Sequence, residues 1–111
     1  MRVSKEGDLF RGSHITGPTH NYLGMRVKAE GIQSFDVRVL PPVGECSHGD
    51  AISEEEARAW ISAGVNRANQ ELGAAYGVDY AEVVANDNRR PEVYEELARR
   101  IVHAAHDERS D

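Results

Sequence analysis

The sequence predicts an α+β fold in which two helices cover one face of a small, mainly antiparallel sheet, with the element order (β)ββαβα. Two segments, 54–72 and from 91 onward, place apolar residues at helical spacing, whereas 23–39 alternates apolar and polar residues. One apolar stripe per helix and one apolar sheet face are buried most economically in two layers. With 111 residues, 40% of them hydrophobic, we expect a single domain spanning 1–111.

The first part of the chain is expected to supply the sheet. Segment 8–21 is interpreted as a structured loop with one edge strand at most, because two glycines and a proline interrupt it. Two alternating runs then flank Glu30 and Gly31 and predict a β-hairpin with one solvated face. The inward residues are Leu23, Met25 and Val27 in the first run and Phe35, Val37 and Val39 in the second.

The clearest predicted element is a helix over 54–72. Ser53 and Glu56 have the spacing of a capping box, and Gly73 is placed to end the helix in a left-handed conformation. Trp60 falls on the apolar stripe, so we expect it to pack in the core instead of serving as a ligand platform.

A third strand and a second helix are expected after Gly73. The run 78–86 contains Tyr80, Val83 and Val84 and predicts the strand, and Pro91 suits the first turn of the helix. The tail 106–111 is expected to fray. Some apolar residues fall on the solvated side of these elements, and they predict a homo-oligomer, most simply a dimer: Leu40, Val83 and either Val93 or Tyr94.

Composition and charge exclude several function classes. A single cysteine, Cys46, cannot form an internal disulfide, and the net charge of −6 argues against duplex nucleic acid as a partner. The sequence has no apolar run long enough to cross a bilayer and its start lacks the pattern of a signal peptide, so we expect a cytoplasmic protein without a membrane partner.

Catalytic and metal-binding patterns are weak. His14, His20, Cys46 and His48 could in principle bind zinc, but their spacing is not that of a zinc site. His14-Ile15-Thr16 matches one half of the paired HxT motifs of 2H phosphoesterases, and the second half is missing. We therefore predict no catalytic residue, metal or cofactor, and a phosphodiesterase using His14 or His20 remains a minor alternative.

Two polar loops are the candidate binding segments. In 16–21, Thr16, Thr19 and His20 offer hydroxyls and a ring nitrogen for an anion or a ribose, although such hydroxyls also cap their own backbone. In 86–90, Arg89 and its neighbour Arg90 stand at a helix start whose free amides suit a phosphate; the alternative is a helix cap followed by solvated arginines.

A family resemblance rests on these same segments. The chain has TGPTHN at 16–21, a predicted hairpin and long helix, and then YAEVVANDNRRPEVYEELARRI at 80–101. It resembles the first of the Thoeris anti-defence families, small phage proteins that sequester cyclic ADP-ribose signals. The resemblance implies a pocket completed across an oligomer interface, in which Tyr76 stacks on adenine, Asn86 pairs with a base or ribose edge, and Arg100 binds the pyrophosphate. Tyr76 is equally explained as a core residue at a strand end.

The functional hypothesis is therefore a non-catalytic sponge that binds a cyclic nucleotide signal at the 16–21 loop, the 86–90 loop and a neighbouring subunit's last helix. The alternative is a small acidic adaptor, steered to a basic protein by glutamates such as Glu54, Glu55, Glu95 and Glu96.

Overall fold

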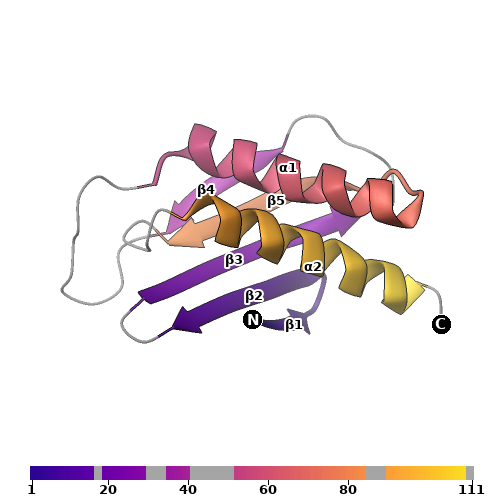
Figure 1. Ribbon diagram of the computed structural model, residues 1–111, viewed down its shortest axis with the longest axis horizontal. Coiled ribbons are helices and arrows are strands. Elements are labelled where there is room, and N and C mark those ends of the chain that lie inside the picture. Colours follow the sequence, from indigo (N-terminus) through magenta and orange to yellow (C-terminus); the bar gives the residue numbers. More distant parts are fainter. Residues whose placement is uncertain (17–18, 30–34, 41–51, 85–89, 110–111) are drawn as a thin grey trace.

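The computed structural model describes residues 1–16, 19–29, 35–40, 52–84 and 90–109, and in them two helices cover one face of a five-stranded sheet (Figure 1). The elements are β1 (Arg2–Glu6), β2 (Leu9–Thr16), β3 (Thr19–Lys28), β4 (Asp36–Leu40), α1 (Glu54–Leu72), β5 (Gly77–Val84) and α2 (Pro91–Arg109). This arrangement confirms the predicted α+β class with a mostly antiparallel sheet. No helix in the described segments is both long and apolar enough to span a membrane.

The strand order is β1-β2-β3-β5-β4, which corrects the predicted hairpin. Both predicted strands exist, as β3 and β4, but β5 lies between them, antiparallel to β3 and parallel to β4. An alternating pattern of apolar and polar residues indicates a strand, but it does not show which other strand it pairs with. The partner is set by α1, because a helix crossover joins parallel strands, and by burial of the apolar β5 inside the sheet.

The opening segment is more regular than predicted, because it forms two antiparallel strands, β1 and β2. Gly7 occupies the turn between them with a left-handed φ of 64°. Gly12 does not interrupt β2: a Cβ there would stand 3.0 Å from the Leu97 Cδ2 of α2. A glycine in a strand here marks the close approach of a helix and not a break in the strand.

Helix α1 has the predicted bounds. The Ser53 side chain accepts from the Glu56 backbone, the Glu56 side chain accepts from the Ser53 backbone, and Gly73 ends the helix with φ 62°. Helix α2 begins at Pro91 as predicted but continues to Arg109, so the expected fraying from 106 is wrong as far as 109. An ion pair between Lys5 and Glu108 ties the last turns to the sheet.

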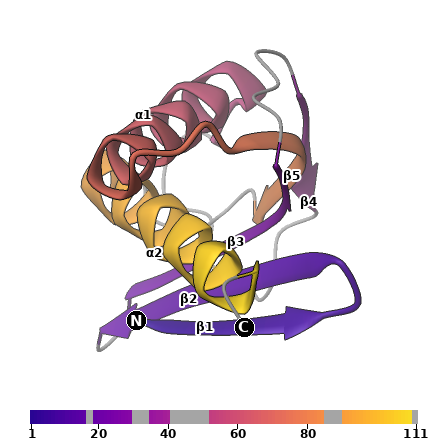
Figure 2. The same ribbon diagram turned by 90° about the vertical axis from the view of Figure 1, so that its right-hand side faces the viewer.

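The core lies between the helices and one sheet face (Figure 2). Val83, Val93 and Tyr94, expected on the solvated side, are buried there, and Leu40 is half-buried. One reason is a register shift in β5 between Val78 and Tyr80, which brings Val78 and Val83 to the same covered face. The apolar residues that suggested an oligomer are thus largely used within one chain, and the oligomer stays a prediction.

At the start of α2 both Val93 and Tyr94 are buried because the helix is wedged between α1 and the sheet. The Tyr94 ring stacks on Trp60 of α1, with centroids 5.4 Å apart. Trp60 is half-buried and packs against the core, as predicted. The Tyr94 hydroxyl accepts a hydrogen bond of 3.3 Å from Asn21 Nδ2, and Asn21 is fully buried. Asn21 thus belongs to the core, although it stands in the candidate loop 16–21.

Candidate functional site

The two candidate loops border the same end of the sheet. Strand β2 ends at Thr16, which pairs with Thr19 at the start of β3, and His20 follows in β3. The start of β3 lies beside the end of β5, and the end of β4 lies beside it as well, because Leu23 and Val39 both pair with Val83. Both helices begin at this end (Figure 1). Asn86 and Arg89 lie outside the described residues, as do Cys46 and His48.

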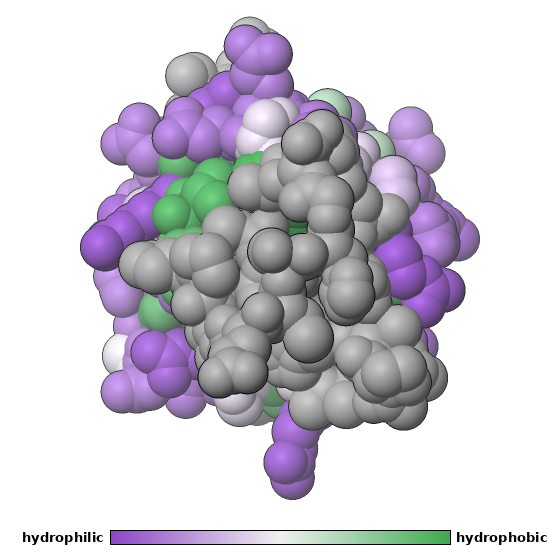
Figure 3. All heavy atoms as spheres, turned by 90° about the vertical axis from the view of Figure 1, so that its left-hand side faces the viewer, coloured by the Kyte–Doolittle hydropathy of each residue, from purple (hydrophilic) through white to green (hydrophobic). Residues whose placement is uncertain are grey.

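Figure 3 views this end of the molecule. Hydrophilic side chains dominate the described surface in this view, and an apolar patch is visible in its upper left part. His14 is half-buried within β2. The described residues contain no group of three or more His, Cys, Asp or Glu side chains that could hold a metal ion.

Tyr76 lies at the opposite end of the sheet, just before β5. Asn69 holds its backbone on both sides: Asn69 Nδ2 donates to the Tyr76 carbonyl and Asn69 Oδ1 accepts from the Tyr76 amide, each at 2.9 Å. The Tyr76 Oη lies 2.8 Å from His106 Nδ1. The eight residues of β5 separate Tyr76 from the loop-bearing end by about 23 Å. A pocket that contains both ends therefore requires a second subunit.

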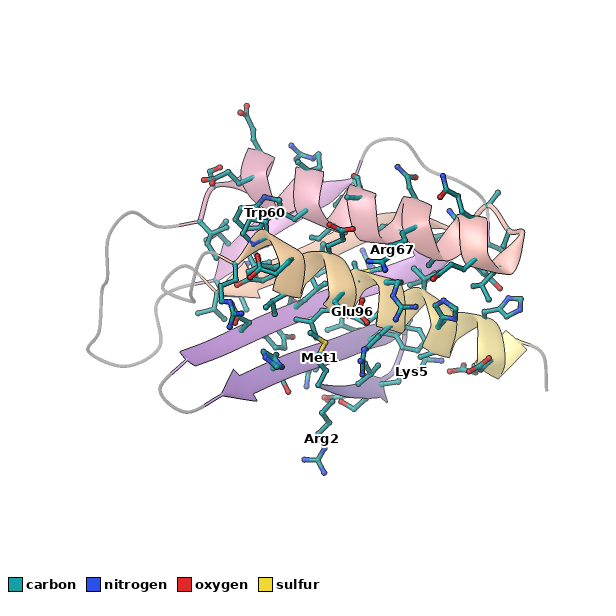
Figure 4. The ribbon with its side chains drawn as sticks, viewed as in Figure 1. Met1, Arg2, Lys5, Trp60, Arg67 and Glu96 are labelled. Atoms are coloured by element: carbon teal, nitrogen blue, oxygen red, sulfur yellow. The ribbon has the colours of Figure 1, made fainter. Side chains whose placement is uncertain are left out.

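Arg100 lies on the solvent side of α2, where its Nε donates to Glu96 Oε1 at 2.9 Å. Glu96 and Arg67, both labelled in Figure 4, lie at the seam between the two helices. Arg99 binds Glu96 and also Glu71 of α1, at 2.7 and 3.0 Å. Hydrogen bonds from Arg99, and secondarily from Arg100, lower the pKa of Glu96 to about 2.

These ion pairs bear on the acidic-adaptor hypothesis. Glu96 is paired with Arg99, and Glu95 lies 3.8 Å from Arg67 Nη1. Two of the four glutamates named for a basic partner thus have arginine neighbours within this chain.

The open face of the sheet, opposite the helices, carries a polar and aromatic cluster that the sequence analysis did not single out. Tyr22 Oη donates to Glu82 Oε2 at 2.7 Å, and Tyr80 Oη donates to Glu82 Oε1 at 2.9 Å. One carboxylate therefore anchors two phenol rings from neighbouring strands. We call this cluster the tyrosine–arginine face; its members are Arg11, Tyr22, Arg26, Arg38, Tyr80 and Glu82.

Gly24 makes this arrangement possible. A Cβ at Gly24 would lie 2.7 Å from the Tyr22 Oη and 2.8 Å from the Glu82 Cγ. The Tyr22 side chain thus lies across the backbone of Gly24 to reach Glu82 on the adjacent strand. Any larger residue at this position would push the phenol and the carboxylate apart.

Arginines flank both rings. The Arg26 guanidinium lies over the Tyr80 ring, 5.1 Å from its centroid, while its Nε donates to Asp79 Oδ1 at 3.1 Å. Arg38 also lies beside Tyr80, and Arg11 beside Tyr22. Arg11 and Arg26 each also pair with a carboxylate, Glu6 and Asp79 respectively, so the face is a network of rings, cations and carboxylates.

The electrostatics keep both phenols protonated. Burial, followed by the hydrogen bond and the negative charge of Glu82, raises the pKa of Tyr22 and of Tyr80 above the usual value of 10.0. The raised pKa keeps both hydroxyls protonated, as their hydrogen bonds to Glu82 require.

A shallow hollow adjoins this face. It has a volume of about 210 Å³ and is lined by Asp8, Leu9, Arg26 and Tyr80. Pockets that enclose a whole drug-sized ligand are larger, typically about 300 Å³ or more. The hollow is therefore too small to enclose a whole ligand of that size.

Charge is divided between the two layers of the described structure. On its strands basic residues outnumber acidic ones, and on its helices the reverse holds. The charged strand residues are Arg2, Lys5, Arg11, Arg26, Lys28 and Arg38 against Glu6, Asp36, Asp79 and Glu82. Four of these six basic residues form ion pairs: Lys5 with Glu108, Arg11 with Glu6, and both Arg26 and Lys28 with Asp79. The strands of the described structure thus carry a small excess of basic residues, although the whole chain carries −6.

The sequence does contain a signal for the open face. Tyr22, Gly24 and Arg26 alternate with the buried Leu23 and Met25, so they fall on the solvated side of the predicted strand. Their meeting with Tyr80 and Glu82, however, depends on the pairing of β3 with β5, which alternation does not reveal.

Comparison with known proteins adds no relative: no family model, curated protein or solved structure matches this chain significantly.

Proposed function

We propose that this protein is a non-catalytic binding protein for nucleotides, which it holds on the tyrosine–arginine face. The observation that carries the proposal is the anchoring of two phenol rings by one carboxylate, between arginines from three strands. The cyclic ADP-ribose signal implied by the family resemblance belongs to this ligand class, and sequestration in the cytoplasm would be its biological use.

Each part of a nucleotide has a partner on this face. Tyrosine rings and arginine planes stack on bases of any sequence. Arginine forks bind phosphate oxygens in pairs, which gives affinity without a metal ion. The hollow beside Tyr80 and Arg26 has room for a ring system next to these groups.

The same geometry favours binding over turnover. General acids and bases work best when their pKa lies near the operating pH. Here the pKa values of Tyr22 and Tyr80 are raised away from neutrality, and both hydroxyls are occupied by Glu82. These groups are suited to hold rings in position.

The test is a titration calorimetry panel of mono-, di- and cyclic nucleotides that includes a cyclic ADP-ribose isomer. The bound ligand should be released with unchanged mass after heat denaturation, as judged by mass spectrometry. Arg26→Ala and Tyr80→Leu should each weaken binding about 10-fold or more.

Arg67→Ala removes an arginine of the helix side and is the matched control, with no expected effect on binding. Arg100→Ala tests the pocket implied by the resemblance: a large loss of affinity there, with none for Arg26→Ala, would move the site to the helix side. Ligand of altered mass would show an enzyme, and an absence of binding by the whole panel would refute the proposal.

A further inference from the structure

We propose that the tyrosine–arginine face binds two or three consecutive nucleotides of a single-stranded nucleic acid, with the base rings across β3 and β5 and the phosphates toward Arg11 and Arg38. This inference rests on the proposed function and makes it more specific. It follows from the extent of the face, its repetition and the distribution of charge.

The face is wider than one nucleotide needs. Its side chains come from four adjacent strands, with Arg11 on β2, Tyr22 and Arg26 on β3, Tyr80 on β5 and Arg38 on β4. Neighbouring strands lie about 4.8 Å apart, so the face extends over about 14 Å. Aromatic side chains on a sheet of such width stack two or three bases.

The face also repeats one unit. Tyr22 lies beside Arg11, and Tyr80 lies beside Arg26 and Arg38, so each ring has a cation of its own. A ring for the base and a cation for the phosphate are the two groups that one nucleotide of a single strand requires. Two such units in a row therefore match two successive nucleotides.

Glu82 determines where the phosphates of the bound nucleic acid lie on the face. Its carboxylate lies between the two rings and would repel a phosphate placed above it. Phosphates are thus directed outward to the arginines on either side, while the bases occupy the middle of the face.

Charge complementarity selects a single strand over a duplex. The helices carry more acidic than basic residues and the strands carry a small basic excess, so the open face of the sheet repels a polyanion less than the helix side does. Duplex binding depends on a broad basic face, whereas a single strand gains much of its affinity from base stacking. The net charge of −6 disfavours the first mode and permits the second.

The experiment is fluorescence anisotropy with labelled oligouridine and oligodeoxythymidine of one, two, four and eight nucleotides, and with a 16-base-pair duplex, at low salt. The affinity should rise steeply from one nucleotide to about four, and then level off. The duplex should bind at least 10-fold more weakly than the octamers. Binding of either octamer supports the inference, and the ratio of the two affinities distinguishes RNA from DNA.

Variants locate the site. Tyr22→Leu and Tyr80→Leu should each lower octamer affinity about 10-fold, whereas Tyr22→Phe, which keeps the ring, should retain most of it. Arg38→Ala should weaken binding and reduce its salt dependence, and Arg67→Ala on the helix side is the matched control. Thermal unfolding of each variant verifies that it is folded, and the exposed Arg38 keeps the test valid if a tyrosine variant does not fold.

The outcomes separate the two proposals. A mononucleotide that binds as tightly as the octamers would overturn this inference and leave the proposed function intact. A preference for the duplex, or octamer binding that no face variant changes, would also overturn it. If the octamers bind and no nucleotide of the calorimetry panel does, sequestration of a small nucleotide is refuted and binding of a single strand at this face stands. If neither mononucleotides nor oligonucleotides bind, both proposals fall.

Discussion

Gly64 of α1 offers the sharpest test of the packing between the two helices. Its backbone lies against α2 so closely that a Cβ would stand 2.8 Å from the Ala98 Cβ and 3.1 Å from the Glu95 carbonyl carbon, with the Glu95 carbonyl oxygen nearer still. Ordinary van der Waals contact begins at 3.4 Å. A Gly64→Ala variant must therefore move the helices apart by roughly 1 Å, since the obstacle is backbone and cannot rotate away.

Two opposing contributions set the magnitude. Alanine favours a helix over glycine by about 1 kcal/mol, which by itself would stabilise the protein. Overpacking costs about 1–3 kcal/mol, and more when a backbone has to shift. Separating the helices by this distance also weakens the other contacts between them. We therefore expect the free energy of unfolding to fall by about 2 kcal/mol, which corresponds to a Tm lower by roughly 10 °C.

The assay is urea unfolding followed by circular dichroism, with Asn66→Ala as control, because Asn66 is exposed on the same helix. The control should be neutral or slightly stabilising, since alanine is the better helix former. Equal or greater stability of Gly64→Ala would refute the close approach of α1 and α2.

Three further predictions concern stability. Ser53→Ala removes the helix cap and should cost about 1 kcal/mol in urea unfolding. Asn69→Ala leaves the backbone of Tyr76 without both of its side-chain hydrogen bonds and should cost about 1–3 kcal/mol, with little change expected for an Asn66→Ala control. The pKa of Glu96 is lowered from 4.5 to about 2 by Arg99, so its stabilising contribution is full above pH 4.5 and is lost as the pH falls toward 2. Glu96→Gln should therefore be less stable than wild type at pH 7 and equal to it near pH 2. A difference in stability that persists on acidification would contradict the ion pair.

The candidate site was only partly accessible to sequence reasoning. The loops 16–21 and 86–90 were proposed from composition, and the pairing of β3, β4 and β5 brings their flanking strand ends to one end of the sheet. Tyr76 was proposed from a resemblance, and it lies at the other end, where Asn69 and His106 hold it. The tyrosine–arginine face was missed because its members lie far apart in the sequence, 60 positions for Tyr22 and Glu82, and meet only across paired strands.

The sequence by itself determined the elements whose signals are local. The helix over 54–72 has its capping box, its apolar stripe and its terminal glycine within one continuous segment, and the start of α2 is marked by Pro91. These features act between residues a few positions apart, so they operate before any tertiary contact forms.

Only the tertiary structure decided which strands pair and which faces are buried. The alternation in β3 and β4 is the same whether they pair with each other or with β5, and a register shift of one residue reverses every side chain that follows it. The insertion of β5 buried Val83, brought Glu82 between Tyr22 and Tyr80, and so created the open face. The physical reason is that segments far apart in the sequence compete to pair with the same strand and to bury the same surface. Which of them pairs therefore depends on the packing of the whole core.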